Sequence, residues 1–215
     1  MIRAEAVIRL LLPLGAATLS GCAIPQQAVP AAREAAGWRS VATDDDRERL
    51  RGWRTIWLQA LERARNAGQG AEIAREGALL DPDAALAQPL PPPGDYRCRT
   101  IKIGSQSESG LEYVAYPAYR CRIAADDGLL TFTKLSGSQR PVGVLLPDSD
   151  RRYVFLGTLQ LGDETGALQY GRDRERDMAG VIERIGEDKW RLVFPYPHFE
   201  STIDVLELVP KSAAG

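Results

Sequence analysis

The sequence has a single histidine and three cysteines among 215 residues. So few imidazole and thiolate groups argue against zinc sites built from several histidines or several cysteines. The 27 lysines and arginines are balanced by 29 aspartates and glutamates, so the net charge of −2 offers no basic surface for a nucleic acid. We therefore expect no metal, no cofactor and no nucleic-acid partner.

The chain also lacks the short motifs of several enzyme classes. Gly-x-Ser-x-Gly, His-Glu-x-x-His, Ser-x-x-Lys and the Gly-Lys-Ser/Thr of a phosphate loop do not occur. The one histidine, His198, lies in the stretch Pro195-Tyr196-Pro197-His198-Phe199, which is more typical of a loop than of a general base. No catalytic residue is predicted. Paired carboxylates for glycoside hydrolysis stay open, because their separation is not visible in a sequence.

The first 22 residues have the organisation of a lipoprotein signal. Arg3 and Arg9 lead into an apolar stretch over 10–19, which is far shorter than the roughly 20 apolar residues of a spanning helix. The stretch ends in Leu19-Ser20-Gly21-Cys22, which resembles the bacterial lipobox, where the cysteine is diacylated and becomes the new N-terminus. We expect residues 1–21 to be a signal peptide and Cys22 to be lipidated. The alternative is an ordinary secretory signal with a chance cysteine.

Two acyl chains suffice for stable membrane anchoring, so the membrane is an expected partner. Ala23 follows the cysteine; by resemblance to the enteric sorting rule, in which aspartate there retains a lipoprotein at the inner membrane, this indicates the outer membrane, facing the periplasm. Residues 22–37 are rich in Pro, Ala and Gln and are interpreted as a tether. At roughly 3.3–3.6 Å per extended residue, the tether reaches up to about 50 Å. A short helix over 31–36 is the alternative.

The two remaining cysteines, Cys98 and Cys121, form an even pair in an oxidising compartment, which predicts a disulfide. A thiol nucleophile is the alternative, but no Cys–His arrangement is evident. Their surroundings repeat as Tyr-Arg-Cys-Arg at 96–99 and 119–122. If the cysteines face each other on adjacent antiparallel strands, the hairpin centre falls between Ser109 and Gly110, a plausible turn.

This register puts Arg97 opposite Arg122 and Arg99 opposite Arg120, on the face away from the disulfide. Like charges that face each other destabilise a sheet, so these four arginines need anions. We favour an internal salt network with the acidic segments 126–127 or 173–177. The other interpretation is an anion-binding face for phosphate or carboxylate groups. A bulge at Pro117 would change this register.

Residues 38–80 carry helical signals. Thr43 or Asp44 can cap a helix whose apolar residues recur at steps of three and four, which predicts one face docked on the protein's own core. These apolar residues are Leu50, Trp53, Trp57, Leu61 and Ala64. A second short helix is expected at about 71–75, ending at Gly77. Prolines then make 81–94 a linker that no helix crosses.

Residues 95–210 change to a strand period, with short turns and no helical segment between strands. This pattern predicts a mainly β fold with a helical N-terminal piece: an antiparallel up-and-down β-barrel of about eight strands, calycin-like, because closure hides the sheet edges. A β-sandwich is the alternative. At one strand connection, Ser138, Gln139 and Arg140 form a candidate polar loop. The predicted strands cover 95–103, 112–123, 129–136, 141–146, 152–161, 167–171, 178–185, 190–194 and 202–209.

Three segments, 94–99, 134–140 and Trp190-Arg191-Leu192-Val193, resemble a family of exported bacterial proteins known only as a domain of unknown function, over about residues 38–210. The resemblance implies an envelope protein with one disulfide and carries no activity. More distantly, the predicted barrel is similar to secreted calycin-type inhibitors of metalloproteases. We expect a lipid-anchored, non-enzymatic binding or envelope-maintenance module in the bacterial cell envelope, with an unidentified envelope ligand or protein as partner. A periplasmic protease inhibitor and a hydrolase on an unfamiliar barrel are the alternatives.

Overall fold

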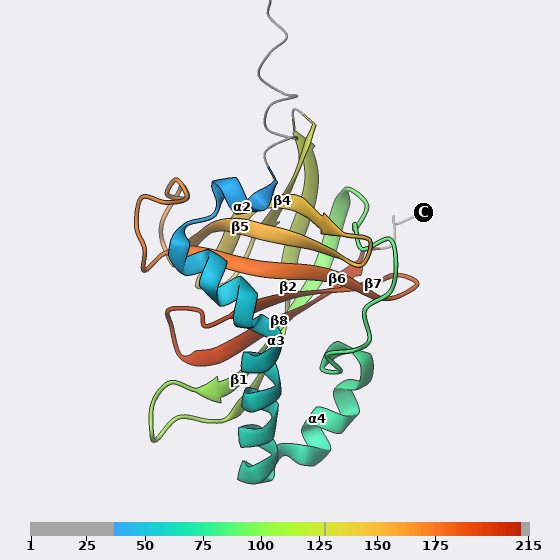
Figure 1. Ribbon diagram of the computed structural model, residues 1–215, viewed down its shortest axis with the longest axis vertical. Helices are drawn as coiled ribbons and strands as arrows, with labels where there is room; N and C mark the ends of the chain where they lie inside the picture. The colour runs from blue at the N-terminus through green and yellow to red at the C-terminus, as the bar shows by residue number, and fades with distance from the viewer. Residues whose placement is uncertain (1–36, 127, 212–215) are drawn as a thin grey trace, which may run out of the picture.

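The computed structural model describes residues 37–126 and 128–211 (Figure 1). The predicted signal peptide, the lipidation of Cys22 and all of the tether except Gly37 lie outside the described residues. Eight antiparallel strands form a closed barrel in which each strand pairs with its neighbour in sequence, and β8 pairs back onto β1. The predicted up-and-down barrel is therefore confirmed, and the sandwich alternative is wrong. The strands are β1 (Gly94–Ser105), β2 (Tyr113–Asp126), β3 (Leu129–Lys134), β4 (Gln139–Ser149), β5 (Arg152–Leu161), β6 (Asp177–Gly186), β7 (Lys189–Pro195) and β8 (Ser201–Pro210).

One predicted strand, residues 167–171, does not form. This segment belongs to the connection between β5 and β6, where Gly171 adopts a φ of 82°. Its tyrosine, Tyr170, instead docks on the first helical turn: the hydroxyl accepts a hydrogen bond from the Thr43 N–H at 3.1 Å and donates to the Asp46 carboxylate. The strand-like sequence of residues 167–171 therefore belongs to a loop in which Tyr170 docks on α3, and it does not pair with a sheet.

The helical piece consists of α2 (Trp38–Val41), α3 (Asp44–Ala64) and α4 (Gly70–Glu76), followed by a short turn, η2 (Gly77–Leu79). Thr43 caps α3, since its hydroxyl accepts from the Asp46 N–H at 3.2 Å. After Ala64 the turn η1 (Arg65–Gln69) reverses the chain, and Gly68 permits this with a φ of 89°. Among the described residues, no helix has both the length and the apolar character needed to cross a bilayer.

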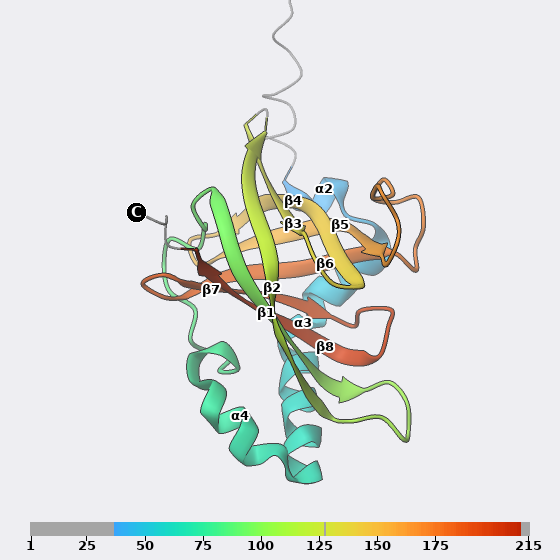
Figure 2. The ribbon, with the colours of Figure 1, turned by 180° about the vertical axis from the view of Figure 1, so that it is seen from behind.

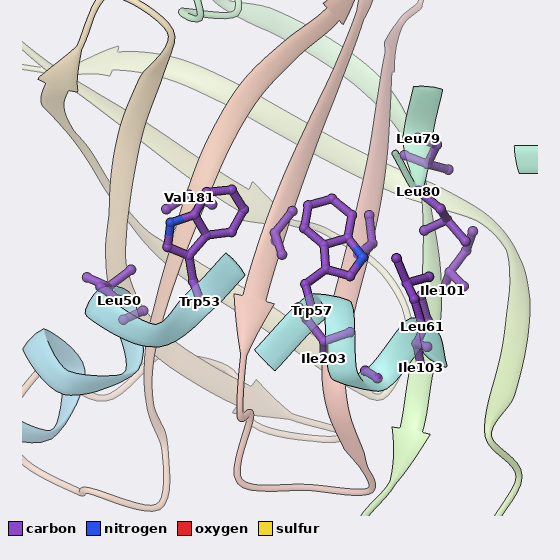
Figure 3. Close-up of a cluster of buried hydrophobic side chains, with 14 of the residues drawn as sticks. Leu50, Trp53, Trp57, Leu61, Leu79, Leu80, Ile101, Ile103, Val181 and Ile203 are labelled. Atoms are coloured by element: carbon purple, nitrogen blue, oxygen red, sulfur yellow. The ribbon is translucent and has the colours of Figure 1, made fainter. Parts of the chain in front are cut away.

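The apolar face of α3 packs on the outside of the barrel (Figure 3). Trp57 and Leu61 are fully buried there, against side chains that include Ile103 and Ile203. The predicted docking of this face on the protein's own core is confirmed. It also explains why β6, β7 and most of β8 are buried along almost their whole length, whereas β2 alternates between exposed and buried positions. The face that carries β2 has no described helix over it (Figure 2).

Side chains that point inward fill one end of the barrel. The predicted Cys98–Cys121 disulfide is present there, and its Cα atoms are 5.9 Å apart. Tyr96 and Trp190 meet edge to face beside it, with ring centroids 6.3 Å apart. Around them pack further apolar residues: Ile123, Phe132, Leu145, Phe155, Ile182, Leu192 and Leu208.

The predicted hairpin register is wrong by two residues. Cys98 pairs with Tyr119 and Cys121 with Tyr96, so the two cysteines bond diagonally and not directly across the strands. The register shifts again between Arg99 and Ile101, opposite Pro117. A β-bulge at this proline was the alternative that the sequence allowed. The predicted central turn at Ser109–Gly110 therefore does not bisect the strand pairing.

A buried arginine joins the helical piece to the barrel. Arg191 on β7 has no exposed surface, and its guanidinium contacts the Glu183 carboxylate at 2.7 and 2.8 Å. The same group donates to the main-chain carbonyls of Ala78, at 2.9 Å, and Asp81, and its Cζ lies 4.5 Å from the ring centre of Trp57. One side chain therefore contacts the sheet, the central helix and the chain that leads into the linker.

We expect Arg191→Met to lower the free energy of unfolding by about 3–5 kcal/mol, because it leaves the Glu183 carboxylate buried without a counter-ion. Adding Glu183→Gln should recover part of that loss, since no buried charge then remains. Denaturant unfolding of the two single variants and the double variant measures this coupling. Additive effects would show that the two groups do not act as a pair.

Candidate functional site

The end of the barrel opposite the disulfide is hollow. It encloses a cavity of about 90 Å³ that opens to solvent, enough for several water molecules or one small ligand group. One wall is polar and the facing wall is apolar. The polar lining consists of Thr100, Lys102, Tyr116, Tyr119, Lys134, Ser138, Gln139, Glu200 and Asp204; the apolar lining consists of Pro141, Leu159, Met178, Phe194, Pro197, Phe199 and Leu206.

Strand alternation places the polar groups at one level of the barrel. On β1 the inward positions pass from Cys98 to Thr100 and then Lys102, and on β3 they pass from Phe132 to Lys134. On β8, Asp204 pairs with Lys102 in register. Three strands therefore change from apolar to ionisable side chains where the filled part of the barrel ends.

Lys102 is neutralised within the protein. Its ammonium lies 3.0 Å from the Asp204 carboxylate and 3.3 Å from that of Glu200, and Asp204 also accepts from the Ser201 hydroxyl. Burial alone would lower the pKa of Lys102, but the two carboxylates raise it above its usual value. Burial raises the pKa of the Asp204 carboxyl, although its contacts with Lys102 and Ser201 offset part of that cost. This lysine is consequently held charged and in place.

Lys134 has no such partner. It is 6% exposed, donates to the main-chain carbonyl of Gln139 at 2.8 Å and lies 4.4 Å from the ring centre of Tyr119. Among the described residues, no carboxylate forms a salt bridge with it. Burial, followed by the nearby charge of Lys102, lowers the pKa of Lys134 to about 8. The cavity thus contains a buried ammonium whose remaining N–H groups are available to an anion.

Phe194 divides the hollow part of the barrel from the filled part. It lines the cavity and packs edge to face on Phe155, with ring centroids 5.3 Å apart. The Phe155 ring in turn lies over the paired glycines Gly143 and Gly157, where an added Cβ would approach it to 2.7 and 2.6 Å. The close approach of β4 and β5 therefore depends on both glycines and fixes the cavity floor.

The candidate polar loop is split between two positions. Ser138 and Gln139 line the cavity mouth, and the Gln139 amide donates to Glu200 across it at 3.4 Å. Arg140 is not part of the lining. Its guanidinium donates to four main-chain carbonyls, those of Gly137, Leu161, Gly162 and Glu164, and so fastens two neighbouring turns together.

The candidate anion-binding face differs from the sequence prediction because the hairpin register differs. Arg97 lies opposite Arg120, not opposite Arg122, and both are exposed. Arg122 pairs with Asp95 at 2.7 Å. Arg99, opposite Ala118 and not Arg120, contacts Glu76 and Glu207 at 2.5 and 3.1 Å. Two of the four arginines therefore have internal partners, but these are neither 126–127 nor 173–177.

The sequence did not predict three buried charged groups of the cavity: Lys102, Lys134 and Asp204. Lys134 follows Phe132 by two residues, so its inward direction was readable from strand alternation. The other two lie in segments that are buried on both faces, where alternation carries no signal. His198 is an exposed residue of the loop between β7 and β8. Within residues 37–126 and 128–211, no group of three His, Cys, Asp or Glu side chains could hold a metal.

The low pKa of Lys134, about 8 against an ordinary lysine value near 10.4, has a measurable consequence. Between these values the unfolded chain binds a proton that the folded protein has released. The free energy of unfolding should therefore rise with pH from 8 to 10, by roughly 2 kcal/mol relative to Lys134→Met. Unfolding titrations of both proteins test this, together with NMR of the lysine Cε resonances. A midpoint near 10.4 for Lys134 would contradict it.

Comparison with known proteins gives a family and no activity. A family model described as "Domain of unknown function (DUF4893)" matches residues 38–208. Searches of curated proteins and of solved structures returned no match. The matched range runs from α2 through all but the last two residues of β8, so it takes in the helical piece, the linker and the barrel. The chain therefore belongs to the DUF4893 family.

Proposed function

We propose that this chain is a lipid-anchored binding module of the bacterial cell envelope, and that the hollow end of its barrel binds a small ligand through an anionic group. The lipobox-like sequence that ends at Cys22 supports the anchor and the envelope location. The observation that carries the binding proposal is Lys134, a buried cation in an open cavity that no carboxylate of the described residues neutralises. A buried charge without a counter-ion is costly, and an anionic ligand would remove that cost.

The shape and chemistry of the cavity narrow the class of ligand. Lys102 is already paired with Asp204, so Lys134 is the group that would bind the anion. The facing wall, with Leu159, Met178 and Phe194, would cover an apolar portion of the ligand. A volume of about 90 Å³ favours a small group over a whole oligosaccharide or peptide. The ligand is therefore a small amphipathic anion, such as a carboxylate beside an apolar group.

No catalytic step is needed to account for these groups. A lysine of lowered pKa is also found among nucleophilic lysines, but here its ammonium is held between a main-chain carbonyl and a tyrosine ring. Both contacts favour the protonated form, which suits the binding of an anion. The proposal is therefore a binding function, and it agrees with the leading interpretation of the sequence.

Benzoate and butyrate combine a carboxylate with an apolar group and serve as probes. We expect the wild-type chain to bind at least one of them, and Lys134→Met to weaken that binding at least about tenfold, because a hydrogen-bonded charge pair is lost. Lys211→Met, at an exposed position after β8, is the matched control and should bind as the wild type does. Binding should also weaken as pH rises above about 8, where Lys134 loses its proton. Protein-observed NMR titrations measure all three effects.

Native mass spectrometry of the protein isolated from its own envelope would identify the natural ligand. A reproducible adduct that is lost in Lys134→Met supports the proposal. Equal binding of the probes by Lys134→Met and Lys211→Met would refute it. The mass of the N-terminal peptide tests the anchor separately, because a diacylated Cys22 and a free thiol differ by the mass of the lipid.

A further inference from the structure

A second pocket lies outside the barrel, where α2 and the start of α3 meet β4, β5 and β6. Its volume is about 310 Å³, at the lower end of the range for ligand pockets, and it shares no lining residue with the barrel cavity. Four arginines line it: Arg39, Arg47, Arg51 and Arg152. Among the described residues that line it, Asp148 is the only one with a carboxylate. The pocket is therefore strongly cationic, although the whole chain is slightly acidic.

Asp148 is buried, and its contacts orient neighbouring side chains of the pocket. Its side chain is 4% exposed and accepts hydrogen bonds from the indole N–H of Trp38 at 2.6 Å and from Arg152 at 2.7 Å. Burial would raise the pKa of Asp148, but these bonds hold it below its usual value. The carboxylate consequently stays ionised and orients the Trp38 indole and the Arg152 guanidinium, with a longer contact of 3.3 Å to Arg39.

The other guanidiniums differ in how far they are engaged. Arg39 lies over the Trp38 ring at 4.3 Å and contacts the Asp148 carboxylate at 3.3 Å, but 69% of its side chain is exposed. Arg47 contacts Asp44 on the rim and two main-chain carbonyls. Arg51 is exposed, and no described carboxylate forms a salt bridge with it. Arg39 and Arg51 are therefore the groups most available to an external anion, and guanidinium is suited to phosphate.

Trp38 also borders a pocket of the opposite character. This second space has a volume of about 220 Å³ and a mostly apolar lining, with Leu90, Leu129, Leu130 and Tyr153 among its residues. A cationic pocket and an apolar groove thus adjoin at one indole ring. A molecule with a phosphate next to an apolar part, such as a phospholipid at a bilayer surface, matches this pair of sites.

The position of these two pockets along the chain also favours a phospholipid at a bilayer surface. Trp38 comes directly after the predicted tether, which begins at Cys22. In both ribbon views α2 lies in the upper part of the molecule and α4 at its lower end (Figures 1 and 2). An acylated Cys22 would bring the α2 end, with both pockets, towards the bilayer. This step relies on the anchor of the proposed function.

We propose that the arginine pocket around Trp38 binds the phosphate of an anionic phospholipid headgroup and so holds the domain against the membrane that bears its anchor. The lipid chains alone fix where the protein is, but they leave the domain free to move on its tether. Contact through this pocket would define its orientation and leave the barrel mouth, which shares no lining residue with the pocket, open to its ligand.

The test uses the chain with Cys22→Ser, so that acylation does not cause binding by itself. Sedimentation with vesicles of phosphatidylglycerol and phosphatidylcholine should show binding that vesicles of phosphatidylcholine alone do not support. Arg39→Gln with Arg51→Gln should weaken it at least about tenfold, since each basic group near an anionic surface contributes on the order of a few-fold to tenfold. Arg97→Gln with Arg120→Gln removes the same charge from the exposed face of β1 and β2. It should change binding less than about twofold.

Equal losses in the two double variants would overturn the proposal, since binding would then depend on net charge alone. Absence of binding to the anionic vesicles, or inorganic phosphate binding as tightly as the vesicles, would overturn it too; the second result would assign the pocket to free phosphate. Arg51→Glu alone guards against misfolding, because this side chain has no hydrogen-bond or salt-bridge partner among the described residues. If it stays folded by circular dichroism yet binds as the wild type does, the pocket is not the site. A missing acyl group on Cys22 would remove the anchor but leave this binding intact.

Discussion

Arg191 determines how the two parts of this protein fit together. Its guanidinium is completely buried, yet it is satisfied on every side by the Glu183 carboxylate, by main-chain carbonyls at the start of the linker and by the Trp57 ring. A buried ion pair adds little net stability on average, but it tolerates few alternative arrangements. Arg191 therefore favours one position of the helical piece on the barrel, in which α3 contacts β6, β7, β8 and β1 from the outside.

That covering decides which surfaces are available for function. The strands beneath α3 are buried on both faces, so any opening of the barrel must lie at its ends. One end is closed by the disulfide and by aromatic side chains, and the other contains Lys134 in a cavity with an apolar wall. The same helical piece forms the arginine pocket with β4, β5 and β6. The two proposed sites are thus on separate surfaces, one inside the barrel and one outside.

The sequence was informative wherever structure depends on local pattern. Short turns between strands predicted the barrel, the polar residues Thr43 and Asp44 predicted where the helix begins, and the tryptophan spacing predicted the docked face of α3. Sequence-based predictions were wrong or absent where contacts between distant residues determine the structure. The hairpin register depends on the bulge opposite Pro117, and the burial of Arg191 depends on carbonyls more than 100 residues away in the chain.

The cavity was missed for a related reason. In a strand that is buried on both faces, neither hydrophobicity nor alternation tells which side chains point inward, so Lys102 and Asp204 looked like any other charged residues. The arrangement of the four arginines was predicted from a clear motif, but with the wrong strand register. The repeated Tyr-Arg-Cys-Arg motif was a real regularity, but a two-residue slip brings Asp95 to Arg122 and moves Arg99 away from Arg120, towards Glu76 and Glu207.

The shortness of β3 has one more consequence. This strand has six residues, lies on the side of the barrel without a described helix, and ends at Lys134. Amide protons on β3 are therefore the ones we expect to exchange first with solvent, since few ladder bonds must break and no second layer holds them. Separation of β3 from its neighbouring strands would enlarge the cavity without disturbing the strands under α3. The barrel can thus be rigid on the side under α3 and adaptable on the other, with Lys134 on the adaptable side.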